Sequence, residues 1–131
     1  MIYFTIKELC KSSTALSKGI NNSPSPDIVN NLTLLVDNIL DPLREKYGNP
    51  IIVNGAYRCP ELNKAVGGSK NSQHETGQAA DITTGSSNNN KKLFNLIIEM
   101  NLPFDQLIDE KNFRWIHVSY SNRHRKQILH L

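Results

Sequence analysis

The sequence predicts an α+β fold in which helices pack on one side of a small, mainly antiparallel sheet. Two observations support this class. The first half carries one long apolar stripe at helical spacing, whereas the second half carries short, β-branched segments with one helix inserted among them. The last two predicted strands are close in sequence, and strands joined in this way pair antiparallel. We expect residues 1–131 to form a single domain.

In the first half, Thr5 and Glu8 form a capping box that predicts a short helix to about Cys10. Residues 11–25 are rich in Ser, Asn and Pro and are interpreted as an ordered surface loop. Ser25 as cap, followed by proline and aspartate, predicts the start of a long helix over 26–47. Its apolar face recurs every three or four residues, and Pro42 should kink it near its end.

The second half predicts short elements separated by turn-forming residues. In order, these are strand 51–53, helix 60–66, strand 79–83, a helical stripe from Leu93 to Met100, and strands 104–109 and 113–120. Residues 84–90 are interpreted as a polar loop that ends in a helix cap. A tight turn around Lys111 and Asn112 joins the last two strands, and residues 127–131 could add an edge strand.

Charge and composition limit the partners. The formal net charge is +3, which is too small to indicate nucleic-acid binding, and no apolar run approaches membrane-spanning length. We therefore expect no nucleic-acid partner and no insertion into membranes. We also expect a monomer. Arg123, Arg125 and Lys126 crowd the C-terminus, either as a solvated tail or as a patch for an anionic polymer. The two cysteines, Cys10 and Cys59, could be bridged or free, and a bridge would indicate an oxidising compartment.

A histidine and two further polar residues suggest a metal site. His74 and Asp81 flank Gly77, which lets the backbone turn back so that both side chains can reach one point. His117 lies on a predicted strand whose alternate residues form an aliphatic face. A catalytic zinc takes three protein ligands and keeps one open position. Taken singly, each residue could equally be a surface polar group, a cap or a partly buried histidine.

The motif Ser-x-His-x-x-Gly-x-Ala-x-Asp over 72–81, followed by Trp-Ile-His at 115–117, resembles the zinc D-Ala-D-Ala peptidase family. That family shares its metal core with the hedgehog signalling domain. Residues 54–58, 62–69 and 104–108 are also similar to family segments, so the resemblance covers most of the chain. It implies a hedgehog/DD-peptidase-like fold, Zn²⁺ as cofactor, and His74, Asp81 and His117 as its ligands.

A metallopeptidase also needs a carboxylate that moves a proton. Some family members carry it three residues before the last histidine, where this chain has Arg114, which cannot serve. Glu110 or Asp109 is the expected base, with Glu110 preferred from the resemblance. Arg58 matches a family arginine near the active site, although it could instead be a surface arginine paired with Glu61.

Other residues complete the predicted site. Ser72 and Gln73 are expected to shape the pocket and contact substrate, whereas Trp115 is expected to pack or to form a pocket wall. Cys59 stands where the family usually has serine.

The resemblance implies a zinc peptidase that hydrolyses an amide bond in peptidoglycan stem peptides, as a DD-carboxypeptidase or an endopeptidase. The alternatives are a non-catalytic zinc module related to the hedgehog domain, and a metal-free domain whose basic tail binds a polymer. The N-terminus shows no signal peptide, so we expect a phage-type lysin or a protein whose export signal has been removed.

Overall fold

The computed structural model describes residues 1–131 and contains one five-stranded sheet with helices around it. The strands are β1 (Ile52–Gly55), β2 (Ala79–Thr83), β3 (Gln106–Glu110), β4 (Trp115–Ser119) and β5 (Gln127–His130). Their order across the sheet is β1-β2-β4-β3-β5. Every pair is antiparallel except β3 with β5, which is parallel. The predicted α+β class and the C-terminal edge strand are therefore confirmed.

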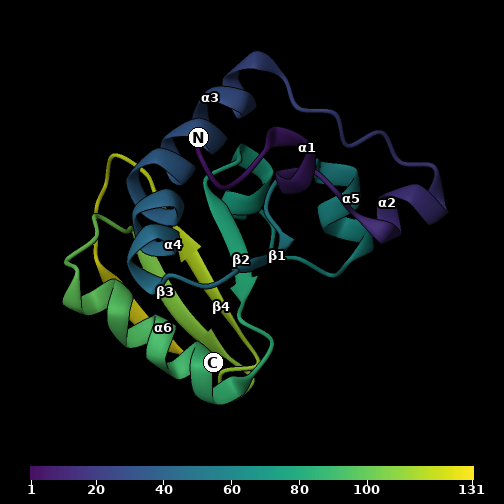
Figure 1. Ribbon diagram of the computed structural model, residues 1–131. Helices are drawn as coiled ribbons and strands as arrows, with labels where there is room; N and C mark the ends of the chain where they lie inside the picture. The colour runs from purple at the N-terminus through teal and green to yellow at the C-terminus, as the bar shows by residue number, and fades with distance from the viewer.

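The helices are α1 (Ile6–Leu9), α2 (Ser13–Lys18), α3 (Pro26–Leu35), α4 (Asp41–Tyr47), α5 (Pro60–Ala65) and α6 (Ser87–Glu99), with a π segment η1 (Val36–Leu40) and a 3-10 turn η2 (Gln73–Thr76). Figure 1 shows α3, α4 and α6 lying across one face of the sheet, and α1, α2 and α5 grouped beside β1. Helices α3, α4 and α6 leave the opposite face of the sheet uncovered. None of the helices combines the length and the apolar character that crossing a membrane requires.

The long predicted helix exists as the continuous run α3–η1–α4. From Leu32 onward its apolar stripe is fully buried, with Leu32, Leu35, Ile39, Leu40 and Leu43 all at 0% exposure. The Asp41 N–H donates to the carbonyl oxygen five residues back, in the wide π turn just before Pro42. Because proline has no N–H to donate, a local widening of the helix accommodates it.

Three local predictions were wrong. Residues 13–18 are helical rather than looped, because Ser12 Oγ accepts a hydrogen bond from the Ala15 N–H and Gly19 ends the helix in the left-handed region. The helix α6 begins at Ser87, inside the expected polar loop, because Ser86 caps it. The turn between β3 and β4 is also longer than expected, because β3 ends at Glu110 and β4 begins only at Trp115. Three consecutive residues in this turn, 111–113, have positive φ.

One hydrophobic cluster joins the sheet to its helices. The cluster contains Ile116 and Val118 from β4 and Ala80 and Ile82 from β2. Alternate residues of these strands therefore face the helices, and the residues between them face the other way. The cysteines are free thiols beside this cluster, and burial raises the pKa of Cys10 to about 11.

Candidate metal centre

Two of the predicted metal ligands are direct neighbours across strands. Asp81 on β2 is paired with His117 on β4 in the antiparallel register. Both lie on the face of the sheet opposite the helices, since Ile116 and Val118 on either side of His117 point into the core. Directly opposed side chains in such a pair begin about 5 Å apart at Cβ. His117 Nδ1 accordingly lies 3.1 Å from Asp81 Oδ1.

The third ligand comes from the turn η2, just before β2. Ser72 Oγ caps this turn by accepting a hydrogen bond from the His74 N–H at 3.1 Å. Gly77 ends it with φ of +73°, a left-handed conformation that glycine adopts without steric cost. The turn brings His74 Nε2 to 3.4 Å from Asp81 Oδ1. The predicted reversal of the chain at Gly77 is thus confirmed.

His74 is held from behind by the backbone. His74 is only 2% exposed, and its Nδ1 lies 2.7 Å from the carbonyl oxygen of Ala56. A carbonyl oxygen can only accept, so Nδ1 carries the hydrogen and Nε2 keeps its lone pair for a metal. This is the usual way in which a protein sets the tautomer of a ligating histidine.

The three donor atoms suit a tetrahedral zinc ion. One donor from each of His74, Asp81 and His117 lies within 4.8 Å of the others. Ligand bonds of about 2.05 Å at tetrahedral angles place two donor atoms about 3.3 Å apart. The observed 3.1 Å and 3.4 Å are close to that spacing. Desolvation raises the pKa of Asp81, but the adjacent imidazoles of His117 and His74 outweigh that effect and hold the pKa well below its usual range. The carboxylate is therefore ionised, as a metal ligand must be.

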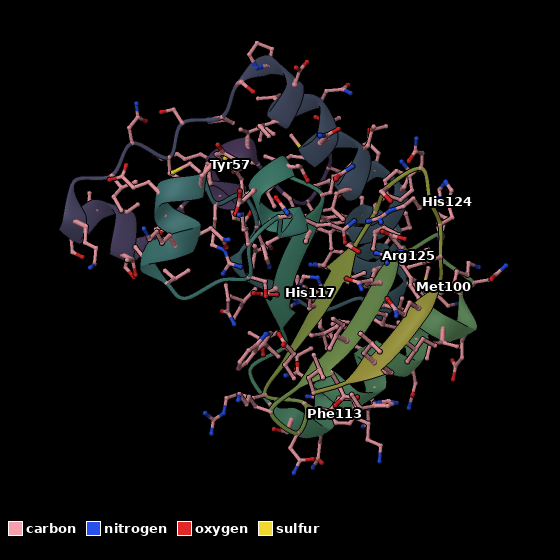
Figure 2. The ribbon with its side chains drawn as sticks, turned by 180° about the vertical axis from the view of Figure 1, so that it is seen from behind. Tyr57, Met100, Phe113, His117, His124 and Arg125 are labelled. Atoms are coloured by element: carbon pink, nitrogen blue, oxygen red, sulfur yellow. The ribbon has the colours of Figure 1, made fainter.

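The centre opens into a polar cavity of about 520 Å³. Figure 2 shows His117 on the sheet face away from the helices, and the cavity lies against this face. Its charged lining residues are Arg58, Lys70, Asp81, Glu110 and Arg125. The segment 66–74 forms one wall, and β3 and β4 form another. Such a cavity can hold an extended, polar ligand across the metal centre.

The structure separates the two candidate bases. Glu110 lines the cavity, and Trp115 Nε1–H donates to its Oε2 at 2.7 Å. Ile108 is paired with His117, so Glu110, two residues further along β3, is a diagonal neighbour of that ligand. Asp109 points to the other face, is 6% exposed, and pairs with His130. Trp115 thus lines the cavity, as expected for a pocket wall, and it also orients the Glu110 carboxylate, a role that the sequence did not predict.

Arg58 lies at the metal end of the cavity. The backbone N–H of Arg58 donates to the carbonyl oxygen of His74 at 3.0 Å, which links the arginine to the turn that carries this ligand. Burial lowers the pKa of Arg58, while the charges of Asp81 and Glu110 oppose that shift. Its Nε is buried without a hydrogen-bond partner, and none of the ion pairs in the structure joins the guanidinium to Glu61. The side chain therefore has donors available to a ligand.

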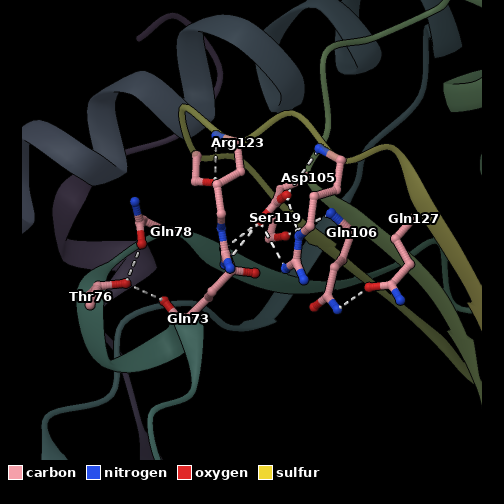
Figure 3. A network of polar contacts seen from close by, with 10 residues as sticks. Gln73, Thr76, Gln78, Asp105, Gln106, Ser119, Arg123 and Gln127 are labelled. Carbon is pink, nitrogen blue, oxygen red and sulfur yellow. Dashed lines mark hydrogen bonds and ion pairs between the residues drawn. The ribbon is translucent and has the colours of Figure 1, made fainter.

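A buried carboxylate near the site escaped sequence reasoning. Asp105 immediately precedes β3, has no exposed side-chain area, and forms ion pairs with Arg123 and Arg125. Gln73, next to His74, donates from Nε2 to Asp105 Oδ2 at 2.8 Å, as Figure 3 shows. Two cations of the basic C-terminus are therefore structural partners of one aspartate. No local pattern signals this cluster, because its members come from three distant segments.

Comparison with known proteins agrees with this geometry. A family model described as Peptidase M15 matches residues 2–119. The chain belongs to the peptidase M15 family. A zinc D-Ala-D-Ala carboxypeptidase of Streptomyces albus G is 46% identical over 48 residues, a stretch that covers 36% of this chain and 19% of that relative. The suspected family is confirmed. Zinc is the cofactor that the family and the His-Asp-His donor set of this M15 chain imply.

Proposed function

We propose that this M15 chain hydrolyses an amide bond in peptidoglycan stem peptides, with His74, Asp81 and His117 as its zinc ligands. The observation that carries the proposal is the trio of donors, all within 4.8 Å of one another, that lines a polar cavity together with Glu110 and Arg58. The similarity to a zinc D-Ala-D-Ala carboxypeptidase supports the substrate class. Bound zinc would polarise the scissile carbonyl and lower the pKa of water at the site.

Glu110 is the proton carrier of the proposed reaction. One carboxylate oxygen is held by Trp115, and the other has no hydrogen-bond partner on the protein. That oxygen can take a proton from the attacking water as its hydroxide adds to the carbonyl carbon. When the C–N bond breaks, Glu110 returns the proton to the leaving amine nitrogen. The diagonal position of Glu110 relative to His117 leaves room for the water and the scissile bond between them.

Arg58 holds the substrate in this scheme. Its guanidinium has a buried, unpartnered N–H close to Asp81 and Glu110. It can donate to a carboxylate or to a carbonyl oxygen that gains charge during the reaction. Ser72 caps the turn that carries His74, and Gln73 lines the cavity, so both contribute to the shape of the substrate site.

The test uses purified, zinc-loaded protein and defined muropeptides, with products identified by mass spectrometry. The product masses also tell whether a terminal D-Ala is removed or an internal bond is cut. Glu110→Gln should retain one zinc per chain and lose roughly 100- to 10,000-fold in turnover, which is the usual contribution of a general base.

Asp109→Asn is the matched control, because it makes the same change one residue away on the opposite face of β3. It should keep turnover close to that of the unmodified protein. Full activity of Glu110→Gln would exclude it as the base. Stoichiometric zinc without cleavage of any muropeptide would favour the non-catalytic module instead.

A further inference from the structure

The C-terminal segment supplies one end of the cavity. Residues 120–131 follow the part of the chain that the family model matches, and they lead into the parallel edge strand β5. Arg125 and Leu131 from this segment line the same cavity as the three metal-ligand candidates. Figure 2 shows Arg125 where the chain approaches β5, at a distance along the sheet from His117. This segment therefore adds a cation to the site beyond the family-matched region.

Asp105 holds Arg125 in a defined orientation. Arg125 donates from Nε to Asp105 Oδ1 at 2.8 Å and from Nη2 to Oδ2 at 3.1 Å, and its backbone N–H also reaches Oδ1. The carboxylate sits at the centre of the network in Figure 3. Because two of the three guanidinium nitrogens are engaged in this fork, the plane of the group is set before any ligand binds.

Arg125 still has binding capacity. Its Nη1 group has no acceptor on the protein, and the side chain is 38% exposed. Asp105 carries one negative charge but pairs with both Arg123 and Arg125, so the cluster keeps one excess positive charge. An anion at Nη1 would balance that charge without displacing Asp105.

Gln73, which shares Asp105 with Arg125, provides a second group for the recognition of a peptide. Gln73 uses Nε2 to donate to the same Asp105, which leaves its Oε1 buried and without a partner. An unpaired buried acceptor is costly unless a ligand N–H satisfies it. Gln73 and Arg125 both line the cavity, and one carboxylate holds both side chains. A peptide segment that carries an N–H and a carboxylate offers the complementary groups.

We propose that Arg125 is a specificity-determining residue that binds a free carboxylate of the peptide substrate, away from the scissile amide. The inference rests on the proposed peptidase function and deepens it. The charges of Asp81 and Glu110, in contrast, raise the pKa of Arg58 against the effect of burial, so Arg58 lies at the end of the cavity that holds the metal ligands. The cavity therefore has two positions for negatively charged or polarised oxygen, one at the reaction centre and one at Arg125.

The test compares stem peptides that differ in a single group. Each free carboxylate of a cleavable muropeptide is converted in turn to a carboxamide, so that the C-terminal, side-chain and α-carboxylates are distinguished. The unmodified protein should cleave one carboxylate form roughly tenfold better in kcat/KM than its carboxamide, the lower range for a charge-assisted hydrogen bond at a partly exposed site. Arg125→Ala should bring that ratio close to one, and Arg125→Lys should give an intermediate ratio because the charge stays but the fork is lost.

Arg123→Ala is the matched control. Arg123 pairs with the same Asp105 at 3.3 Å, is 55% exposed, and does not line the cavity. Its removal takes away the same charge from the same cluster, so the carboxylate-to-carboxamide ratio should remain that of the unmodified protein. An unchanged ratio in both Arg125 variants would overturn the inference. Equal loss of the ratio in Arg123→Ala would assign the effect to overall charge and overturn it as well.

A binding measurement separates this inference from the proposed reaction. Zinc-loaded Glu110→Gln and the double variant with Arg125→Ala are titrated calorimetrically with the same peptide pairs. A preference for the carboxylate that disappears with Arg125→Ala supports the inference even if no peptide is cleaved, in which case only the proposed catalysis fails. Absence of any peptide binding overturns it. Binding of teichoic acid that falls equally in the Arg123 and Arg125 variants, with unchanged peptide preference, would instead assign the basic segment to an anionic polymer.

Discussion

Replacing Asp105 with asparagine should destabilise the protein, because this side chain is the common acceptor for two distant segments. Asp105 has no exposed side-chain area and accepts hydrogen bonds from Arg125 and Gln73 at 2.8–3.1 Å. Asparagine keeps one acceptor oxygen, but its amide group would face donors where the second oxygen now accepts. The two arginines would then lose the charge that balances them.

The size of the effect follows from the burial of the partners. Removing one member of a fully buried ion pair costs about 3–5 kcal/mol, whereas exposed pairs contribute about 0–1 kcal/mol. Asp105 is shielded, but Arg125 and Arg123 are 38% and 55% exposed, so water screens part of the interaction. We expect a loss of about 2 kcal/mol in the free energy of unfolding. For 131 residues, with an unfolding entropy of about 2.1 cal/mol/K per residue, that loss lowers Tm by about 7 °C.

The pH dependence gives this prediction its own signature. Hydrogen bonds from the Arg125 side chain hold the pKa of Asp105 well below its usual range, against the opposing effect of burial. A depressed carboxyl pKa stabilises the folded state above the unfolded-state pKa of about 3.9, and this contribution is lost as the pH falls towards the folded-state value. The stability difference between the unmodified protein and Asp105→Asn should therefore be constant from pH 7 to 5 and shrink below about pH 4.

Urea unfolding followed by circular dichroism at several pH values measures this difference. Asp37→Asn is the control, because Asp37 forms an exposed pair with the N-terminus and should change Tm by less than about 2 °C. An Asp105→Asn variant as stable as the unmodified protein at pH 7, or a difference that does not shrink in acid, would refute the reasoning.

Three further outcomes are expected. Asn90→Ala should cost about 3 kcal/mol in urea unfolding, because Asn90 is fully buried and its Nδ2 bonds the carbonyl oxygens of Phe113 and the next residue; a loss below about 1 kcal/mol would contradict this. Gly77→Ala should lower Tm and zinc stoichiometry together, because φ is +73° and the added Cβ would lie 3.0 Å from Ile28 Cγ2; normal zinc content by metal analysis would contradict it. Chelation should lower the Tm of the unmodified protein by removing a ligand of the folded state, but leave the Tm of Asp81→Ala unchanged; equal shifts would argue against this site.

The sequence predicts much of the framework because its signals are local. The apolar stripe of residues 26–47 identifies a buried helical face wherever that helix packs, and Gly77 marks the chain reversal between two ligand candidates. Short caps were harder to recognise. Ser12 and Ser86 cap helices that begin within polar stretches, where no apolar residues at helical spacing indicate a helix.

Residue pattern alone determined the donor types: two histidines and a carboxylate suited to zinc, and two adjacent acidic residues at the end of a strand. Tertiary structure decided how they are used. Strand alternation puts Glu110 and Asp109 on opposite faces, but only the pairing of β3 with β4, and the packing of α6 against the sheet, determine which face meets the cavity. The same applies to Arg125, which reaches the site through a parallel strand pair and a buried aspartate twenty residues away. Such contacts depend on register and chain path, and no local periodicity encodes them.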